Sequence, residues 1–214
     1  MQLGVSTCDP LKNVEIGPVS LDTFLIVTDG ACEGDSSRVG SVGGVLVDPS
    51  GCCCQHLSSE VPVDFMRRAL ACSANPIYEL ELLPIYIALY AWGRMLKSTH
   101  LVCYLDNDAA RAALCKVYGS IELAQRIVGC AMRLESRFKT EFWYARVPSH
   151  SNISNGPSRL DFEEVGQLGS KQIEIDWEII LENLFGFRVR FQKGESTGTP
   201  NDPQLLWLEK RCEQ

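Results

Sequence analysis

The stretch Thr23-Phe-Leu-Ile-Val-Thr-Asp-Gly30 is a continuous apolar run that ends in an aspartate and a glycine. Its aromatic and β-branched residues predict a buried strand. A second run of this kind, Leu101-Val-Cys-Tyr-Leu-Asp106, also ends in an aspartate. Functional groups gather where the strands of such sheets end, so Asp29 and Asp106 are candidates for one shared site.

The rest of the chain around these runs predicts an α/β fold with the order β-β-β-α-β-α-α-β. We expect a five-stranded mixed sheet, in which three antiparallel strands are followed by parallel strands, with helices on both faces. Pro84 predicts a kink or a late start in the first helix. The expected strands cover residues 23–31, 39–47, 52–61, 101–106 and 141–147, and the expected helices cover 76–97, 109–118 and 121–138.

The pattern of apolar and polar residues along the chain predicts three parts. Residues 1–21 show little periodicity and are interpreted as an N-terminal arm, and residues 22–160 as the folded domain. Residues 161–214 are interpreted as a C-terminal extension with one helix, over 175–185.

Composition narrows the class of protein. The net charge of -7 argues against binding of nucleic acid through bulk positive charge, so any such contact must be local. The ten cysteines are too sparse for a disulfide scaffold and are interpreted as reduced thiols. No apolar stretch suits a signal segment or a membrane span, so we expect an intracellular protein, cytoplasmic or nuclear, without a membrane partner. Basic residues that could supply a local contact, or be only solvated surface charges, are Arg67, Arg68, Arg133, Arg137, Lys139, Arg146 and Arg159.

Carboxylates are the chemically informative groups. Taken singly, Asp29 fits a turn and Asp106 fits the start of a helix, but the pair at two strand ends favours a shared metal site. Magnesium prefers oxygen ligands and needs its charge offset, so a helix carboxylate is expected to join them. Glu79 and Glu81 are both available, on nearly opposite helix faces, and periodicity does not choose between them.

Four ordered motifs together resemble the ribonuclease H domain of retrotransposon reverse transcriptases. The likeness covers roughly residues 22 to 160. The motifs are Thr28-Asp-Gly-Ala31 followed by Gly43-Gly-Val-Leu-Val47, Leu80-Glu-Leu-Leu83, Tyr104-Leu-Asp-Asn-Asp-Ala-Ala-Arg111, and Val147-Pro-Ser-His-Ser-Asn-Ile-Ser-Asn-Gly-Pro-Ser-Arg159.

This resemblance implies a ribonuclease H-like fold and catalytic acids at Asp29, Glu81, Asp106 and position 155. It therefore favours Glu81 over Glu79. Two Mg²⁺ ions, with Mn²⁺ as a substitute, would be held by these residues, one orienting and activating water and the other steadying the leaving 3′ oxygen. The implied reaction is hydrolysis of the RNA strand of RNA·DNA hybrids.

The resemblance also suggests residues and partners around the acids. His150 is expected to shuttle protons or to help the product leave. A reverse transcriptase polymerase domain is an implied partner beside the hybrid. Contacts to substrate, including the 2′-hydroxyls of RNA, are expected from Gly30, Ala31, Cys32, Asn107 and Arg159.

Position 155 departs from the family pattern, because Asn155 stands where a metal-binding aspartate is expected. An amide offers a neutral carbonyl oxygen and offsets no cation charge, so activity should fall sharply. Three explanations stay open: an engineered inactive variant, a decayed element copy, or compensation by Asp161 or Asp108. The alternative functions are an inactive hybrid-binding module and another nuclease of this fold, such as a 3′-5′ exonuclease.

Overall fold

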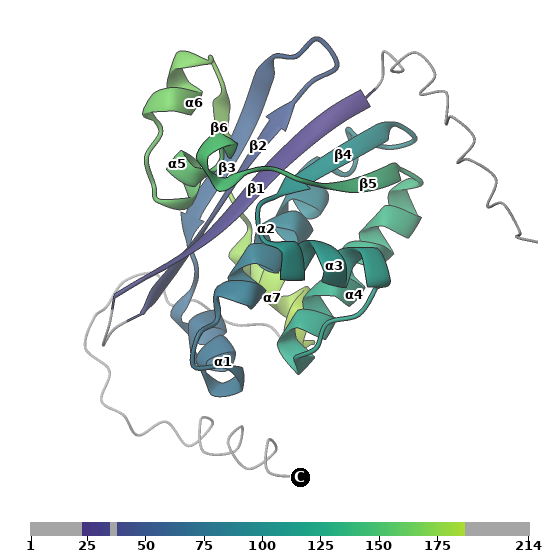
Figure 1. The fold of residues 1–214 in the computed structure, drawn as a ribbon. Coiled ribbons are helices and arrows are strands. Elements are labelled where there is room, and N and C mark those ends of the chain that lie inside the picture. Colours follow the sequence, from purple (N-terminus) through teal and green to yellow (C-terminus); the bar gives the residue numbers. More distant parts are fainter. Residues whose placement is uncertain (1–22, 35–37, 187–214) are drawn as a thin grey trace, which may run out of the picture.

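The computed structural model describes residues 23–34 and 38–186 of the chain (Figure 1). The arm expected over residues 1–21 therefore lies outside the described residues, as does the end of the C-terminal extension.

Six strands form one mixed sheet in the order β5-β4-β1-β2-β3-β6. The pairs β1–β2 and β2–β3 are antiparallel, whereas β1–β4, β4–β5 and β3–β6 are parallel. This confirms the predicted mixed sheet. The strands are β1 (Thr23–Glu33), β2 (Val39–Val47), β3 (Cys53–Glu60), β4 (His100–Leu105), β5 (Glu141–Arg146) and β6 (Lys171–Ile173).

Helices cover both faces of the sheet, as predicted (Figure 1). On one face, α1 (Val63–Cys72), α2 (Ile77–Trp92), α3 (Asp108–Lys116), α4 (Glu122–Phe138) and α7 (Trp177–Phe185) enclose the main core. On the other face lie α5 (Asn155–Ser158) and α6 (Glu163–Gln167), and η1 (Ser149–Ser151) lies between β5 and α5 in the chain. There Val165 of α6 packs on Val45 and Val47 of β2 in a second, smaller core.

Helix α2 is the centre of the main core, because it is apolar all round and almost entirely buried. A helix of that kind belongs inside a protein rather than on its surface. It begins at Ile77, so the late start allowed for Pro84 is wrong, and Pro84 lies inside the helix.

Three expectations about the elements need correction. The sheet has six strands rather than five, because β6 pairs with β3 in parallel. Helix α1 was not expected, although Phe65, Met66 and Ala69 form its buried face. The division of the chain at residue 160 stays a prediction, but the described part of the extension contains α6, β6 and α7 rather than one helix.

Candidate active site

Three carboxylates meet where β4 ends beside β1. Asp29 lies within β1, Glu81 lies on α2, and Asp106 directly follows β4. One carboxylate oxygen of each residue lies within 4.8 Å of the others. Asp29 and Glu81 are buried and Asp106 is half-buried. The geometry therefore selects Glu81 over Glu79 as the partner of the two aspartates.

A close contact between β1 and α2 brings Asp29 and Glu81 together. A Cβ atom on Gly30 would lie 2.3 Å from the Leu80 carbonyl oxygen and 2.8 Å from the Glu81 nitrogen, so only glycine fits there. Pro84 has no N–H with which to bond that same carbonyl. The residue after Asp29 and the residue before Glu81 are thus in direct contact.

Helix α5 supports the cluster from the other face of the sheet. The Ser158 hydroxyl donates a hydrogen bond to Asp29 Oδ2. Ser41 and Ser58, on β2 and β3, donate to the carbonyls of Ser158 and Pro157, each at 2.5 Å. A Cβ atom on Gly43 would lie 2.3 Å from the Ser158 nitrogen, so this glycine lets α5 sit directly on β2.

Burial and repulsion between the carboxylates raise the pKa values of Glu81 and Asp29. Burial, followed by repulsion from Asp29 and Asp106, raises the pKa of Glu81 from 4.5 to about 9. Burial also raises the pKa of Asp29, although the Ser158 hydrogen bond and the charge of Arg159 oppose it. Glu81 Oε2 is buried without a hydrogen-bond partner among the described residues. The positive charge of Arg159 is therefore too little to offset the buried carboxylates.

The carboxylates line a polar cleft of about 390 Å³. Gly30, Ala31, Cys32 and Arg159, all expected to contact substrate, line it too. Sequence reasoning missed Glu33, Ile77 and Ser149 as lining residues, and it missed the role of Ser158. Ser158 stood in the quoted motif, but a serine there carries no signal of its partner on β1.

Asn155 also lines the cleft, at the first residue of α5. Its Nδ2 donates to the Ser149 carbonyl at 2.6 Å, which leaves Oδ1 as the side-chain atom able to contact a cation. Neither proposed substitute for a carboxylate here belongs to the cluster. Asp108 pairs with Arg111 and Arg146, and Asp161 accepts from the Glu163 backbone nitrogen.

Three other candidates lie outside the cleft lining. Glu79 is fully buried, and neither of its oxygens has a hydrogen-bond partner among the described residues. His150 is exposed on η1. Asn107 Oδ1 caps α3 by accepting from the nitrogens of Ala109 and Ala110, each at 3.0 Å. Of the basic residues expected to supply local charge, only Arg159 lines the cleft.

No family model matches the chain, and no curated protein matches it. Solved structures do match. The N-terminal ribonuclease H domain of rv2228c from Mycobacterium tuberculosis is 13% identical, covering 69% of this chain and 99% of that one, with a TM-score of 0.52. Ribonuclease H1 from Halobacterium salinarum is 16% identical, covering 66% and 98%, with a TM-score of 0.52.

This chain has the ribonuclease H fold. The fold expected from the four motifs is therefore confirmed, while the retrotransposon setting stays a prediction. Within this ribonuclease H fold, the cleft with Asp29, Glu81 and Asp106 is the acidic site that β1, β4 and α2 build together.

Proposed function

We propose that this chain binds RNA·DNA hybrids at the acidic cleft and hydrolyses the RNA strand there, slowly because of Asn155. The observation that carries the proposal is the convergence of Asp29, Glu81 and Asp106 in a ribonuclease H fold. A fold by itself does not fix a function, whereas a site with suitable chemistry can.

The carboxylate cluster suits hard divalent cations. All of its donor atoms are oxygens, two of the three residues are buried, and Glu81 Oε2 lacks a partner among the described residues. Asp29, Glu81, Asp106 and the Asn155 carbonyl oxygen would hold Mg²⁺ or Mn²⁺. Bound cations would supply charge that activates water and stabilises the phosphate in the transition state. The binding of two ions, which the resemblance implies, remains part of the proposal.

The residues of the chain have separate tasks in this reaction. Ser158 holds Asp29 in one orientation, and the Gly30–Leu80 contact fixes the distance between Asp29 and Glu81. Held in this way, the carboxylates need little reorganisation when substrate arrives. Gly30, Ala31 and Cys32 line the cleft. Backbone groups of this segment would bond 2′-hydroxyls of RNA there and so select the RNA strand.

Asn155 favours a second candidate function, a hybrid-binding module with negligible cleavage. Because Nδ2 is bonded to the Ser149 carbonyl, the side chain offers one neutral oxygen in place of a carboxylate. That oxygen offsets no cation charge. The hybrid could still dock through the backbone and Arg159 while hydrolysis stops.

The test compares cleavage of an end-labelled RNA·DNA hybrid by the unchanged protein, Asn155→Asp and Asp29→Asn, in Mg²⁺ and in Mn²⁺. Asn155→Asp should cleave the RNA strand at least tenfold faster than the unchanged protein, and Asp29→Asn should be inactive. Binding of the hybrid without cleavage by the unchanged protein would favour the second candidate. No cleavage by Asn155→Asp in either metal would contradict the nuclease proposal, and a preference for single-stranded DNA would point to an exonuclease.

A further inference from the structure

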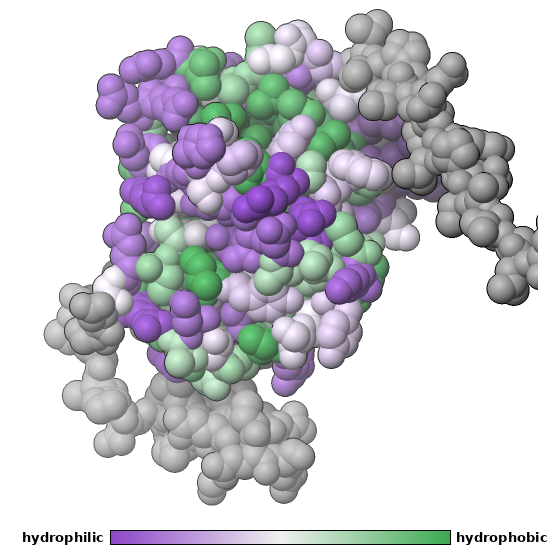
Figure 2. Space-filling view, in the orientation of Figure 1, coloured by the Kyte–Doolittle hydropathy of each residue, from purple (hydrophilic) through white to green (hydrophobic). Residues whose placement is uncertain are grey.

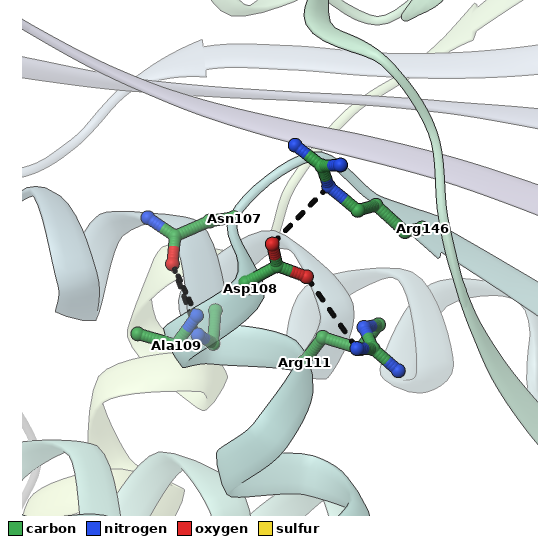
Figure 3. A network of polar contacts seen from close by, with 6 residues as sticks. Asn107, Asp108, Ala109, Arg111 and Arg146 are labelled. Atoms are coloured by element: carbon green, nitrogen blue, oxygen red, sulfur yellow. Dashed lines mark hydrogen bonds and ion pairs between the residues drawn. The ribbon is translucent and has the colours of Figure 1, made fainter.

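A second charged group stands beside the acidic cleft, at the start of α3. Asp108 pairs with two arginines, through Oδ1 with Arg111 Nη2 at 3.4 Å and through Oδ2 with Arg146 Nε at 3.3 Å (Figure 3). Two guanidinium groups on one carboxylate leave this group with a net positive charge. Nothing in the nuclease proposal uses it.

The strand register places this group next to the site. Arg146 ends β5 opposite Leu105, which ends β4, and the Val147 nitrogen donates to the Leu105 carbonyl at 2.9 Å. Asp106 of the carboxylate cluster is the next residue after Leu105. Arg146 does not line the cleft, but Ser149, shortly after it in the chain, does. Arg146 therefore lies at the rim of the cleft.

The guanidinium of Arg146 is oriented and still available. Its side chain is 61% exposed, and its ion pair with Asp108 uses Nε. In Figure 3 the two terminal nitrogens point away from Asp108. Hydrophilic side chains gather on this face where β5 ends and α3 begins (Figure 2). A fork of two N–H donors is the geometry that binds phosphate oxygens.

We propose that Arg146, positioned by Asp108, binds a backbone phosphate of the hybrid next to the phosphate that is cut. The inference rests on the proposed function, since it assumes that a hybrid occupies the cleft. The chain carries a net charge of -7, so attraction to a polyanion must come from such local groups. Arg159 inside the cleft and Arg146 at its rim would contact neighbouring parts of one nucleic-acid backbone.

The effect of replacing Asp108 on hybrid binding distinguishes this proposal from its alternatives. If Asp108 acted only as a negative charge, replacing it would favour binding of an anion. As a positioning residue it holds the Arg146 fork in the binding orientation, so its loss should weaken binding although a repelling charge is removed. An ion pair that only supports the start of α3 predicts neither effect on binding.

The test measures hybrid affinity as a function of salt concentration, in Ca²⁺, which supplies divalent charge without the octahedral geometry of Mg²⁺. Arg146→Gln should weaken binding roughly tenfold, as the loss of one charge-assisted hydrogen bond does. It should also reduce the slope of log K against log salt by about 1. The matched control is Arg126→Gln on α4, which removes an arginine that is likewise paired with a carboxylate, Glu122, at 2.8 Å.

Asp108→Asn should weaken binding in the unchanged background and should not weaken it in Arg146→Gln. Equal slopes for Arg146→Gln and the unchanged protein, an equal effect of Arg126→Gln, or tighter binding by Asp108→Asn would each overturn the inference while leaving the nuclease proposal intact. If the unchanged protein binds no hybrid at any salt concentration, the proposed function and this inference fail together.

Discussion

At the scale of single residues, Glu81 is the carboxyl group whose charged form is strongly disfavoured, with a pKa raised to about 9. It is buried, its Oε2 lacks a hydrogen-bond partner among the described residues, and two other carboxylates lie beside it. Without a cation, and at pH values between the two pKa values of Glu81, the folded protein therefore keeps a proton on this residue that the unfolded chain releases. Stability and metal binding are thus linked through one carboxyl group.

The first prediction concerns pH. The pKa of Glu81 is about 9 in the folded state, against 4.5 for an ordinary glutamate, so the folded state holds more protons between these values. The metal-free protein should therefore lose unfolding free energy as pH rises from about 5 to about 9. The loss is on the order of several kcal/mol, at about 1.4 kcal/mol per unit of pKa difference.

Urea unfolding across this pH range in the presence of EDTA measures the effect. Glu81→Gln should be the more stable protein at high pH and should show a much flatter dependence, because its amide does not titrate. A stability that rises with pH, or the same dependence in Glu81→Gln, would show that the raised pKa of Glu81 is not real.

A second prediction concerns the hydrogen bond from Ser158 to Asp29. Ser158→Ala removes the donor that lowers the pKa of Asp29, so this carboxyl should hold its proton to higher pH. Mn²⁺ affinity at neutral pH should fall, and unfolding free energy should fall by about 1–3 kcal/mol, because a buried acceptor is left unpaired.

Calorimetric titration with Mn²⁺ measures this change. Ser50→Ala is the matched control, because Ser50 donates to an aspartate, Asp48, in an exposed turn. Unchanged Mn²⁺ affinity in Ser158→Ala would mean that Ser158 does not control the site.

For single residues, the sequence was most informative where a carboxylate stands at the end of an apolar run. Asp29 and Asp106 were predictable because each ends an apolar run. Ser158 was not, because its partner lies 129 residues away and only the folded chain brings the two together. Glu81 was separated from Glu79 by resemblance alone, because helical spacing does not choose between them and only the folded chain shows which one lies beside the two aspartates.

At the scale of elements, the seating of short α5 on the sheet determines where Asn155 and Ser158 lie. Gly43→Ala should push α5 away, because the new Cβ would lie 2.3 Å from the Ser158 backbone nitrogen. We expect a loss of about 1–3 kcal/mol in unfolding free energy, as overpacking of a core gives, together with weaker Mn²⁺ binding.

Gly44→Ala serves as the control for that prediction. Its Cβ would lie 3.2 Å from a side-chain atom of Leu57 on β3, a longer distance than the 2.3 Å to backbone at Gly43, so stability should change less and Mn²⁺ affinity should be unchanged. Equal effects of the two substitutions in thermal melts and Mn²⁺ titrations would count against a specific role for the β2–α5 contact.

Elements with a strong apolar pattern were predictable, and those that depend on distant partners were not. Helix α2 and strands β1, β2 and β4 carry continuous apolar runs. Helix α1 has only three buried residues, and β6 has three residues and exists because β3 offers an edge. Pairing of that kind leaves little trace in local sequence.

At the scale of the whole molecule, the core extends past residue 160, where the pattern of apolar and polar residues suggested that the domain ends. Ile180, Leu181 and Leu184 of α7 are buried in the main core. Residues of α7 and α4 are in contact, so part of the expected extension supports the helices behind the site.

Leu181→Ala should therefore reduce unfolding free energy by about 2–5 kcal/mol, as truncation of a buried leucine does. Ile179→Ala, two positions away and 36% exposed, should change it by less than about 1 kcal/mol. Urea unfolding of both variants decides the matter. Near-equal, small effects would mean that α7 is an appendage and not part of the core.

Diffraction from crystals soaked in Mn²⁺ tests the central claim most directly, because anomalous scattering locates the metal without reference to activity. We predict at least one Mn²⁺ ion bound by carboxylate oxygens of Asp29, Glu81 and Asp106, with a second site near Asn155 that is weakly occupied and fills in Asn155→Asp. A cleft without manganese at saturating concentration, in both proteins, would contradict the account.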